Sequence, residues 1–160
     1  MLQKARMLPW RTALSNVTLG MEIKGKVGME ERDKARVLLD RLGLHGFTDR
    51  YPATFSGGMR QRVALARTLV NDPEVLLFDE PFAALDFQTK LLLEADTVRL
   101  VREGGRSLLC ITHDIEEAVS ISDRVIVLTK RPTRAKAVYE IDLGGQHADM
   151  MEARQSPRFN

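Results

Sequence analysis

Two carboxylates stand at the end of an apolar run, in the stretch VLLFDEP at residues 75–81. Four apolar residues lead directly into Asp79 and Glu80, as at the carboxyl end of a strand buried on both faces. In a parallel sheet, ligands bind beyond these strand ends. Asp79 is therefore placed to hold a Mg²⁺ ion, directly or through water, and Glu80 to deprotonate an attacking water. A buried strand that ends in a polar turn would give the same pattern without catalysis.

A histidine follows a second apolar run, SLLCIT, and comes directly before an acidic helix start. If the two runs are neighbouring strands, Asp79, Glu80 and His113 share one edge of one sheet. An imidazole at that edge can donate to a phosphate oxygen or hold the attacking water. Taken alone, His113 is more often a loop or capping residue, so its catalytic interpretation depends on the two carboxylates.

The stretch FSGGMRQR, which begins at Phe55, has the composition of a helix start that contacts phosphate. A helix N-terminus presents unpaired N–H groups and a partial positive charge. Gly57 and Gly58 would let a phosphate approach the backbone, and Ser56 is placed to cap the helix. The sequence contains no G-x-x-x-x-G-K-[ST], the loop that normally grips nucleotide phosphates. A capped helix whose glycines serve only a turn is the alternative.

Asp86 lies six residues after Glu80, in PFAALDFQTK. Its simplest role is to cap the helix predicted over about residues 86–103, which Gly104 and Gly105 can stop. An acid on a loop just after the catalytic edge could also contact a second subunit. The spacing alone leaves both roles open.

The elements that must position these side chains alternate along the chain. MEERDKARVLLDRLGL predicts an amphipathic helix, with apolar residues at i, i+3, i+4 and i+7 from Ala35. A second helix is expected from Ser56 to about Val70. Buried strands are expected at EVLLF and SLLCIT and a third strand at RVIVLT, with an edge strand at AKAVYEIDL. Helices separate the buried strands, which indicates an α/β fold with a mostly parallel sheet and crossover connections.

The composition is that of an ordinary globular chain. Its 160 residues are 44% hydrophobic and 29% charged, enough for one domain with one core. The formal net charge of +2 is spread over mixed basic and acidic residues, which argues against nucleic acid. We find no signal peptide and no apolar run of roughly 18 residues, so a membrane link would go through a partner. The single cysteine, Cys110, fits a reducing compartment and is expected to be a small buried hydrophobe.

The order of Gln3, FSGGMRQR, LLFDEP, ALD and THD resembles that of the nucleotide-binding subunits of ABC transporters. The resemblance covers residues 2–143. It implies a P-loop NTPase-like α/β fold with a helical subdomain, and ATP and Mg²⁺ as the bound groups. The stretch RMLPWRTALSNV looks like the subfamily that serves nitrate, sulfonate, taurine and bicarbonate importers.

The resemblance assigns roles to the matching residues in the first half of the chain. Gln3 looks like the glutamine of the Q-loop, which contacts Mg²⁺ or the attacking water and links the site to the membrane subunit. Ser56, Gly57 and Gly58 look like the signature motif, with Phe55 where leucine is usual.

Four further residues match positions in the catalytic core of the family. Asp79 matches the aspartate that holds the metal, and Glu80 matches the catalytic glutamate. Asp86 matches the D-loop aspartate at the dimer interface, and His113 matches the switch histidine.

The same resemblance implies a domain layout and a set of partners. Residues 1–160 would form a partial ABC ATPase domain, with a helical subdomain at about 10–51, a signature helix and catalytic core at 52–143, and a tail at 144–160. The implied partners are a second ATP-binding subunit and a membrane permease that contacts the helical subdomain, without nucleic acid. The implied location is cytoplasmic, on the inner face of the membrane. Plain helical packing explains most apolar residues of 10–51 equally well.

The P-loop and the adenine-stacking aromatic of the family lie upstream of the Q-loop glutamine, which is here residue 3. The resemblance therefore predicts an N-terminally truncated subunit. When complete it would couple ATP hydrolysis to the import of a small anion, and the isolated chain would be inactive. A non-catalytic remnant that only binds a permease or an intact subunit is the alternative. A soluble relative in DNA repair or translation is disfavoured by the weak net charge and the absence of coiled-coil heptads.

Overall fold

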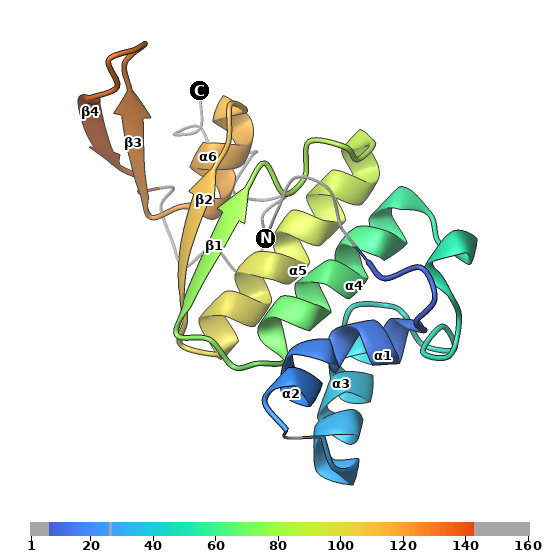
Figure 1. Ribbon diagram of the computed structural model, residues 1–160. Helices are drawn as coiled ribbons and strands as arrows, with labels where there is room; N and C mark the ends of the chain where they lie inside the picture. The colour runs from blue at the N-terminus through green and yellow to red at the C-terminus, as the bar shows by residue number, and fades with distance from the viewer. Residues whose placement is uncertain (1–6, 26, 143–160) are drawn as a thin grey trace. The chain divides into compact units, whose positions relative to one another are not determined.

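The structure is a computed structural model that describes residues 7–25 and 27–142. Its elements are α1 (Ala13–Val17), α2 (Leu19–Ile23), α3 (Met29–Arg41), the 3₁₀ turn η1 (Pro52–Thr54), α4 (Gly57–Leu69), β1 (Val75–Asp79), α5 (Phe87–Glu103), β2 (Ser107–Ile111), α6 (Ile115–Ile121), β3 (Arg124–Leu128) and β4 (Ala135–Glu140). Figure 1 labels the α-helices and the strands. The chain divides into two compact units, Met1–Ile111 and Thr112–Asn160. The predicted α/β class is confirmed.

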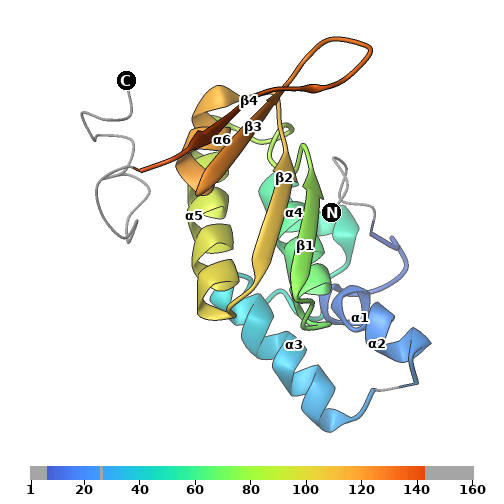
Figure 2. The same ribbon diagram turned by 90° about the vertical axis from the view of Figure 1, so that its left-hand side faces the viewer.

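The first unit packs two long helices against one face of a parallel strand pair. β1 and β2 pair in register, with Asp79 opposite Ile111 at their carboxyl ends. The connection between them is α5, as parallel pairing requires a crossover. Figure 2 shows α4 and α5 lying along the same side of the two strands. Leu76 and Phe78 are buried, and their alternation with exposed residues places them on the helical side.

The core of the first unit extends from this strand pair through α4 and α5 to α1 and α3. Its fully buried side chains include Val17, Leu39, Leu65, Phe78 and Leu93. Burying each such side chain contributes about 1.5–3 kcal/mol relative to leaving it in water. The amphipathic helix predicted for MEERDKARVLLDRLGL is confirmed as α3, which buries Ala35 and Leu39 against its neighbours.

Both strands of the parallel pair have an exposed face, so the prediction of strands buried on both faces is wrong for the described residues. Val75, Leu77, Leu109 and Ile111 expose 56%, 61%, 57% and 58% of their surface. Cys110 is half-buried and not a core residue. The physical reason is that side chains alternate between faces, and in residues 7–25 and 27–142 the helices of the first unit cover only one of them.

Two short helices, α1 and α2, lie in the range 10–51 for which the resemblance implied a helical subdomain, although the residue pattern had indicated only the later helix α3 there. Asn16 of α1 is fully buried, and its amide donates to the carbonyl oxygens of Leu8 and Arg11 at 3.1 and 2.9 Å. Its side-chain oxygen accepts the N–H of Leu8 at 2.8 Å. This one side chain therefore fixes the loop that contains the leucine-proline-tryptophan sequence.

The second unit contains α6 and an antiparallel strand pair. β3 pairs with β4, with Val125 opposite Tyr139 and an irregularity between Val127 and Leu128. RVIVLT was predicted to be the third strand of the main sheet and AKAVYEIDL its edge strand. Both predictions are wrong for the described residues, because β3 and β4 pair with each other in a two-stranded sheet of their own. The connection between the strands is too short for a crossover, and the N–H of Thr129 closes it by donating to the carbonyl of Arg134 at 2.9 Å.

Candidate functional site

The predicted carboxylate pair lies at the carboxyl end of β1. Asp79 is the last residue of the strand and is exposed, and Glu80 follows it and is half-buried. The backbone N–H of Glu80 donates to the carbonyl of Ile111 at 2.8 Å, so the contact with β2 continues one residue past the strand. Glu80 has a φ of +47°, which is uncommon for a residue other than glycine. The chain therefore turns sharply at the proposed base.

The residues after Glu80 are anchored in the core of the first unit. Pro81 and Phe82 are both buried. Gln61 of α4 is also buried, and its side-chain amide donates to the carbonyl oxygen of Pro81. The helix that begins at Gly57 thus makes a direct contact with the turn that carries Glu80.

The start of α4 has the predicted cap. Ser56 Oγ accepts a hydrogen bond from the N–H of Met59 at 3.2 Å. The two glycines that follow have different surroundings. A Cβ on Gly57 would meet nothing within 4 Å, whereas a Cβ on Gly58 would lie 2.5 Å from Thr89 Cγ2 of α5. Gly57 therefore leaves the backbone open to a ligand, and Gly58 allows α4 and α5 to pack closely.

Asp86 is the N-cap of α5, which confirms the simpler of the two roles predicted for it. Its carboxylate accepts the N–H of Thr89 at 3.0 Å, and this hydrogen bond holds the pKa of Asp86 below its ordinary value. Thr89 also contacts the Gly58 position, so the starts of α4 and α5 meet at this threonine. The structure therefore brings Ser56, Gly57 and Gly58 together with Asp86, while a role of Asp86 at a dimer interface stays a prediction.

Because Asp86 caps α5, the folding stability of the chain depends on pH in a direction that can be worked out. Its pKa is lower in the folded chain, so the stabilisation is present above the unfolded pKa of about 3.9 and is lost as pH falls through the folded pKa. We expect Asp86→Ala to lower the thermal midpoint at neutral pH, and the difference from the unchanged chain to shrink below about pH 4. Gln88→Ala, an exposed change in the same helical turn, is the control. A difference that grows on acidification would contradict this role.

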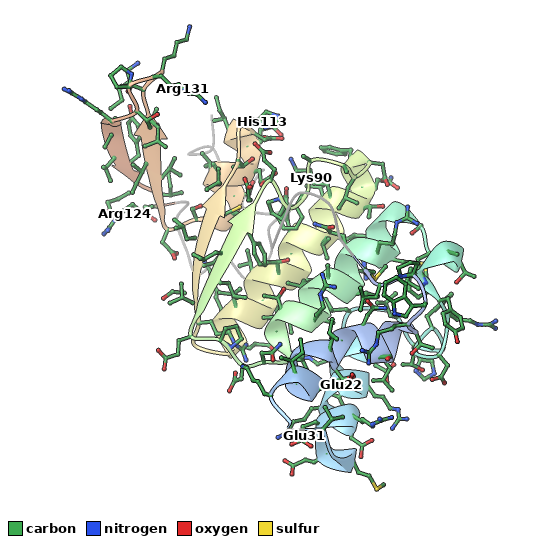
Figure 3. All side chains as sticks on the ribbon, viewed as in Figure 1. Glu22, Glu31, Lys90, His113, Arg124 and Arg131 are labelled. Atoms are coloured by element: carbon green, nitrogen blue, oxygen red, sulfur yellow. The ribbon has the colours of Figure 1, made fainter. Side chains whose placement is uncertain are left out.

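The structure does not test whether His113 and Gln3 lie beside the two carboxylates. His113 belongs to the second unit, where it directly precedes Asp114, the N-cap of α6 (Figure 3). Asp114 accepts the N–H of Glu117 at 3.1 Å. Gln3 lies outside the described residues. The shared edge of Asp79, Glu80 and His113 therefore stays a prediction.

The donor set at the strand end fits one kind of metal ion. Within residues 7–25 and 27–142, no cluster of three or more His, Cys, Asp or Glu side chains could hold a metal by itself. Asp79 presents one exposed carboxylate. Mg²⁺ commonly binds one or two protein carboxylates and completes its coordination with substrate phosphates and water. Asp79 thus fits a magnesium ion that arrives with a nucleotide.

The family follows from a comparison of the sequence with known protein families. The sequence pattern of the family described as ABC transporter matches residues 1–83, more than half of the chain. The chain belongs to the ABC transporter family. Among the described residues of this ABC transporter chain, the helices are too short or too polar to cross a bilayer.

Relatives of this ABC transporter chain are found among both named and solved proteins. The uncharacterized ABC transporter ATP-binding protein MJ0412 of Methanocaldococcus jannaschii is 49% identical over 88% of this chain and 53% of its own length. The taurine import ATP-binding protein TauB of Jannaschia sp. is 38% identical over 98% of this chain and 59% of its own length. The aliphatic sulfonates import ATP-binding protein SsuB of Burkholderia pseudomallei is 48% identical over 80% of this chain and 37% of its own length. The chain thus spans little more than half the length of the first two.

A solved ABC transporter structure shares the fold. It is described as the dimeric, post-hydrolysis state of the ATP-binding cassette MJ0796 bound to ADP and Pi. It is 33% identical, with a TM-score of 0.73, over 88% of this chain and 61% of that chain. The P-loop NTPase-like fold predicted from the motif order is confirmed.

Sequence reasoning missed two residues that organise the site of this ABC transporter chain. Gln61 follows Gly58 by three positions and shares a helix face with Ala64 and Leu65, all of them buried. A polar residue on a buried apolar face is a signal for a hydrogen-bond partner in the core, and this signal was available in the sequence. The contact of Thr89 with the Gly58 position had no comparable signal.

Proposed function

We propose that this chain is part of the ATP-binding and ATP-hydrolysing subunit of an importer, and that ATP hydrolysis drives the uptake of a small anion. The observation that carries the proposal is the helix start at Gly57, which is capped by Ser56 and open to a phosphate. The names of the relatives that import taurine and aliphatic sulfonates support an anion of the nitrate, sulfonate, taurine or bicarbonate type.

In this proposal the carboxylates at the end of β1 act on a nucleotide of the complete protein. Asp79 holds Mg²⁺, which neutralises phosphate charge when bound. Glu80 accepts a proton from the attacking water, and His113 donates to a phosphate oxygen. Gln3 adds a ligand to Mg²⁺ or to the water. The φ of +47° at Glu80 supports this assignment because backbone conformations of this kind cluster at active sites.

The helix start acts across a dimer in the same proposal. Ser56, Gly57 and Gly58 contact the γ-phosphate of a nucleotide held by the P-loop of a second subunit, with Asp86 at the interface. The backbone at Gly57, which is open to a ligand at the capped helix start, supports such a contact. The dimeric solved relative, bound to ADP and Pi, supports a pair of subunits.

The remaining partner is a membrane permease. Residues 10–51, which include α1, α2 and α3, would receive it as a helical subdomain, beside a core at 52–143 and a tail at 144–160. The chain would then lie in the cytoplasm against the inner face of the membrane. A second candidate is a non-catalytic remnant that only binds a permease or an intact subunit. Co-purification with a permease, without any ATPase activity when an intact subunit is added, would support that candidate.

The proposal predicts that the isolated 160-residue chain neither binds ATP at micromolar concentration nor hydrolyses it. The physical reason is that the chain lacks the loop whose N–H groups and lysine hold nucleotide phosphates. Titration calorimetry with ATP and Mg²⁺ on the purified chain checks the first part, and phosphate release checks the second. Micromolar binding by the chain alone would contradict the proposed division of the site between two subunits.

A further inference from the structure

We propose that Gln61 is a positioning residue that holds the turn carrying Glu80 and ties it to the start of α4. The proposal rests on the proposed function for its catalytic consequence, but its structural part stands on contacts of this chain alone. Gln61 has no role in the motif assignments made from the sequence.

The contact itself joins two elements that are far apart in the sequence. The Gln61 side chain is 5% exposed, and its amide nitrogen donates to the carbonyl oxygen of Pro81. Pro81 has no N–H, so its carbonyl is the hydrogen-bonding group that its backbone offers. A buried carbonyl that loses its partner is destabilising, which makes this contact a strong constraint on the residue next to Glu80.

The turn needs such a constraint because the backbone of Glu80 has a positive φ. Glu80 has a φ of +47°, and a residue with a side chain keeps that conformation only when its surroundings impose it. On one side of Glu80, its own N–H is fixed to the carbonyl of Ile111 at 2.8 Å. On the other side, Gln61 fixes Pro81, and Phe82 is buried.

The same residue links this turn to the proposed phosphate contact. Gln61 lies on α4 three positions after Gly58, within one turn of the helix start. A helix transmits a displacement along its axis as a rigid element, so a shift of the Ser56–Gly58 backbone moves the partner of Pro81. We therefore infer that contact of the helix start with a nucleotide across the dimer adjusts the position of Glu80 in the same chain.

Amide hydrogen exchange on the full 160-residue chain tests the structural part. We expect Gln61→Leu to speed the exchange of the Glu80 and Ala83 amides at least tenfold, because the Glu80 N–H donates from the turn to the Ile111 carbonyl and the Ala83 N–H donates to the Glu80 carbonyl. Thr97→Val is the matched control, since it removes another buried hydrogen bond, from Thr97 Oγ1 to the Leu93 carbonyl, in the neighbouring α5. Exchange at Glu80 that is unchanged by Gln61→Leu would overturn the proposal.

Gln61→Glu supplies a second measurement that does not depend on how well the leucine variant folds. Its carboxyl can donate to Pro81 only when protonated, and burial raises the pKa of a carboxyl. Protection of Glu80 in this variant should therefore be low at neutral pH and approach that of the unchanged chain as pH falls, after correction for intrinsic exchange. Protection that falls further on acidification, relative to the unchanged chain at the same pH, would overturn the proposal.

The catalytic consequence is tested in a restored chain, meaning this chain joined in frame to an N-terminal segment that carries G-x-x-x-x-G-K-[ST]. We expect Gln61→Leu to lower its kcat for ATP by roughly 10–100-fold with little change in KM, since a small misplacement of a reacting group has an effect of that order. Thr97→Val should leave kcat near that of the restored chain. An equal loss of kcat in both variants would show that Gln61 contributes only to packing and does not position Glu80. If the restored chain itself is inactive, the proposed function fails, while the exchange experiment still decides the structural part.

Discussion

In the restored chain, Glu80→Gln is expected to keep ATP binding and to slow ATP hydrolysis by roughly 10²–10⁴-fold, the usual contribution of a general base. The amide has nearly the shape of the carboxylate but cannot accept the proton of the attacking water. Glu80 is well placed for this role because it follows the strand end at Asp79, and its backbone is fixed to Ile111. Steady-state phosphate release, together with nucleotide binding by calorimetry, measures both quantities.

The chain offers a matched control for this substitution. Glu74 lies just before the other end of β1 and is exposed, so Glu74→Gln makes the same chemical change away from the site. We expect it to leave turnover unchanged. Turnover of Glu80→Gln close to that of the restored chain would show that Glu80 is not the base. A loss of ATP binding in this variant would instead assign Glu80 to the ground-state site.

The second large effect is expected at Gly58. A Cβ at this position would lie 2.5 Å from Thr89 Cγ2, so Gly58→Ala requires the Thr89 side chain or the start of α4 to shift. Overpacking of this kind typically destabilises a protein by about 1–3 kcal/mol. Gly57→Ala places a methyl group where nothing lies within 4 Å, and surface changes of this kind stay within about 0.5 kcal/mol. Denaturant unfolding of the 160-residue chain measures both.

A double mutant identifies the cause of the loss at Gly58. Thr89→Ser removes the Cγ2 atom that the new methyl group would meet and keeps the backbone N–H that Asp86 accepts. We expect Gly58→Ala with Thr89→Ser to be more stable than the sum of the single changes predicts, by about 1 kcal/mol. Strict additivity would show that the cost arises elsewhere in the helix. Equal costs at Gly57 and Gly58 would show that the two glycines do not differ in function as the structure indicates.

Local signals in the sequence were sufficient for the elements that begin with a cap. Ser56 and Asp86 each precede an apolar helical pattern, and α4 and α5 begin directly after them. The strand end at Asp79 was also predicted, because four apolar residues stop at two carboxylates. These features depend on neighbours in the chain, so composition and spacing determine them.

Features that depend on distant partners were not predictable in the same way. Leu77 and Leu109 stand in apolar runs that suggested burial on both faces, yet both are mostly exposed, because burial depends on what packs against the sheet. The pairing of β3 with β4 was missed because an alternating strand pattern does not specify which strand it joins. The contact of Gln61 with Pro81 joins α4 to a turn beyond β1, and only the folded chain brings them together.

In the proposed function, the helix start at Ser56 acts on a nucleotide held by a second subunit. The direct test mixes this chain with an intact subunit of the family whose own signature serine has been replaced, so that its homodimer is inactive. Ser56→Asp is the control, because aspartate keeps the N-cap while its negative charge repels phosphate. We predict that the unchanged chain restores ATP hydrolysis in the mixture and that Ser56→Asp does not. Equal rates with the two chains, when both bind the subunit equally, would contradict the account.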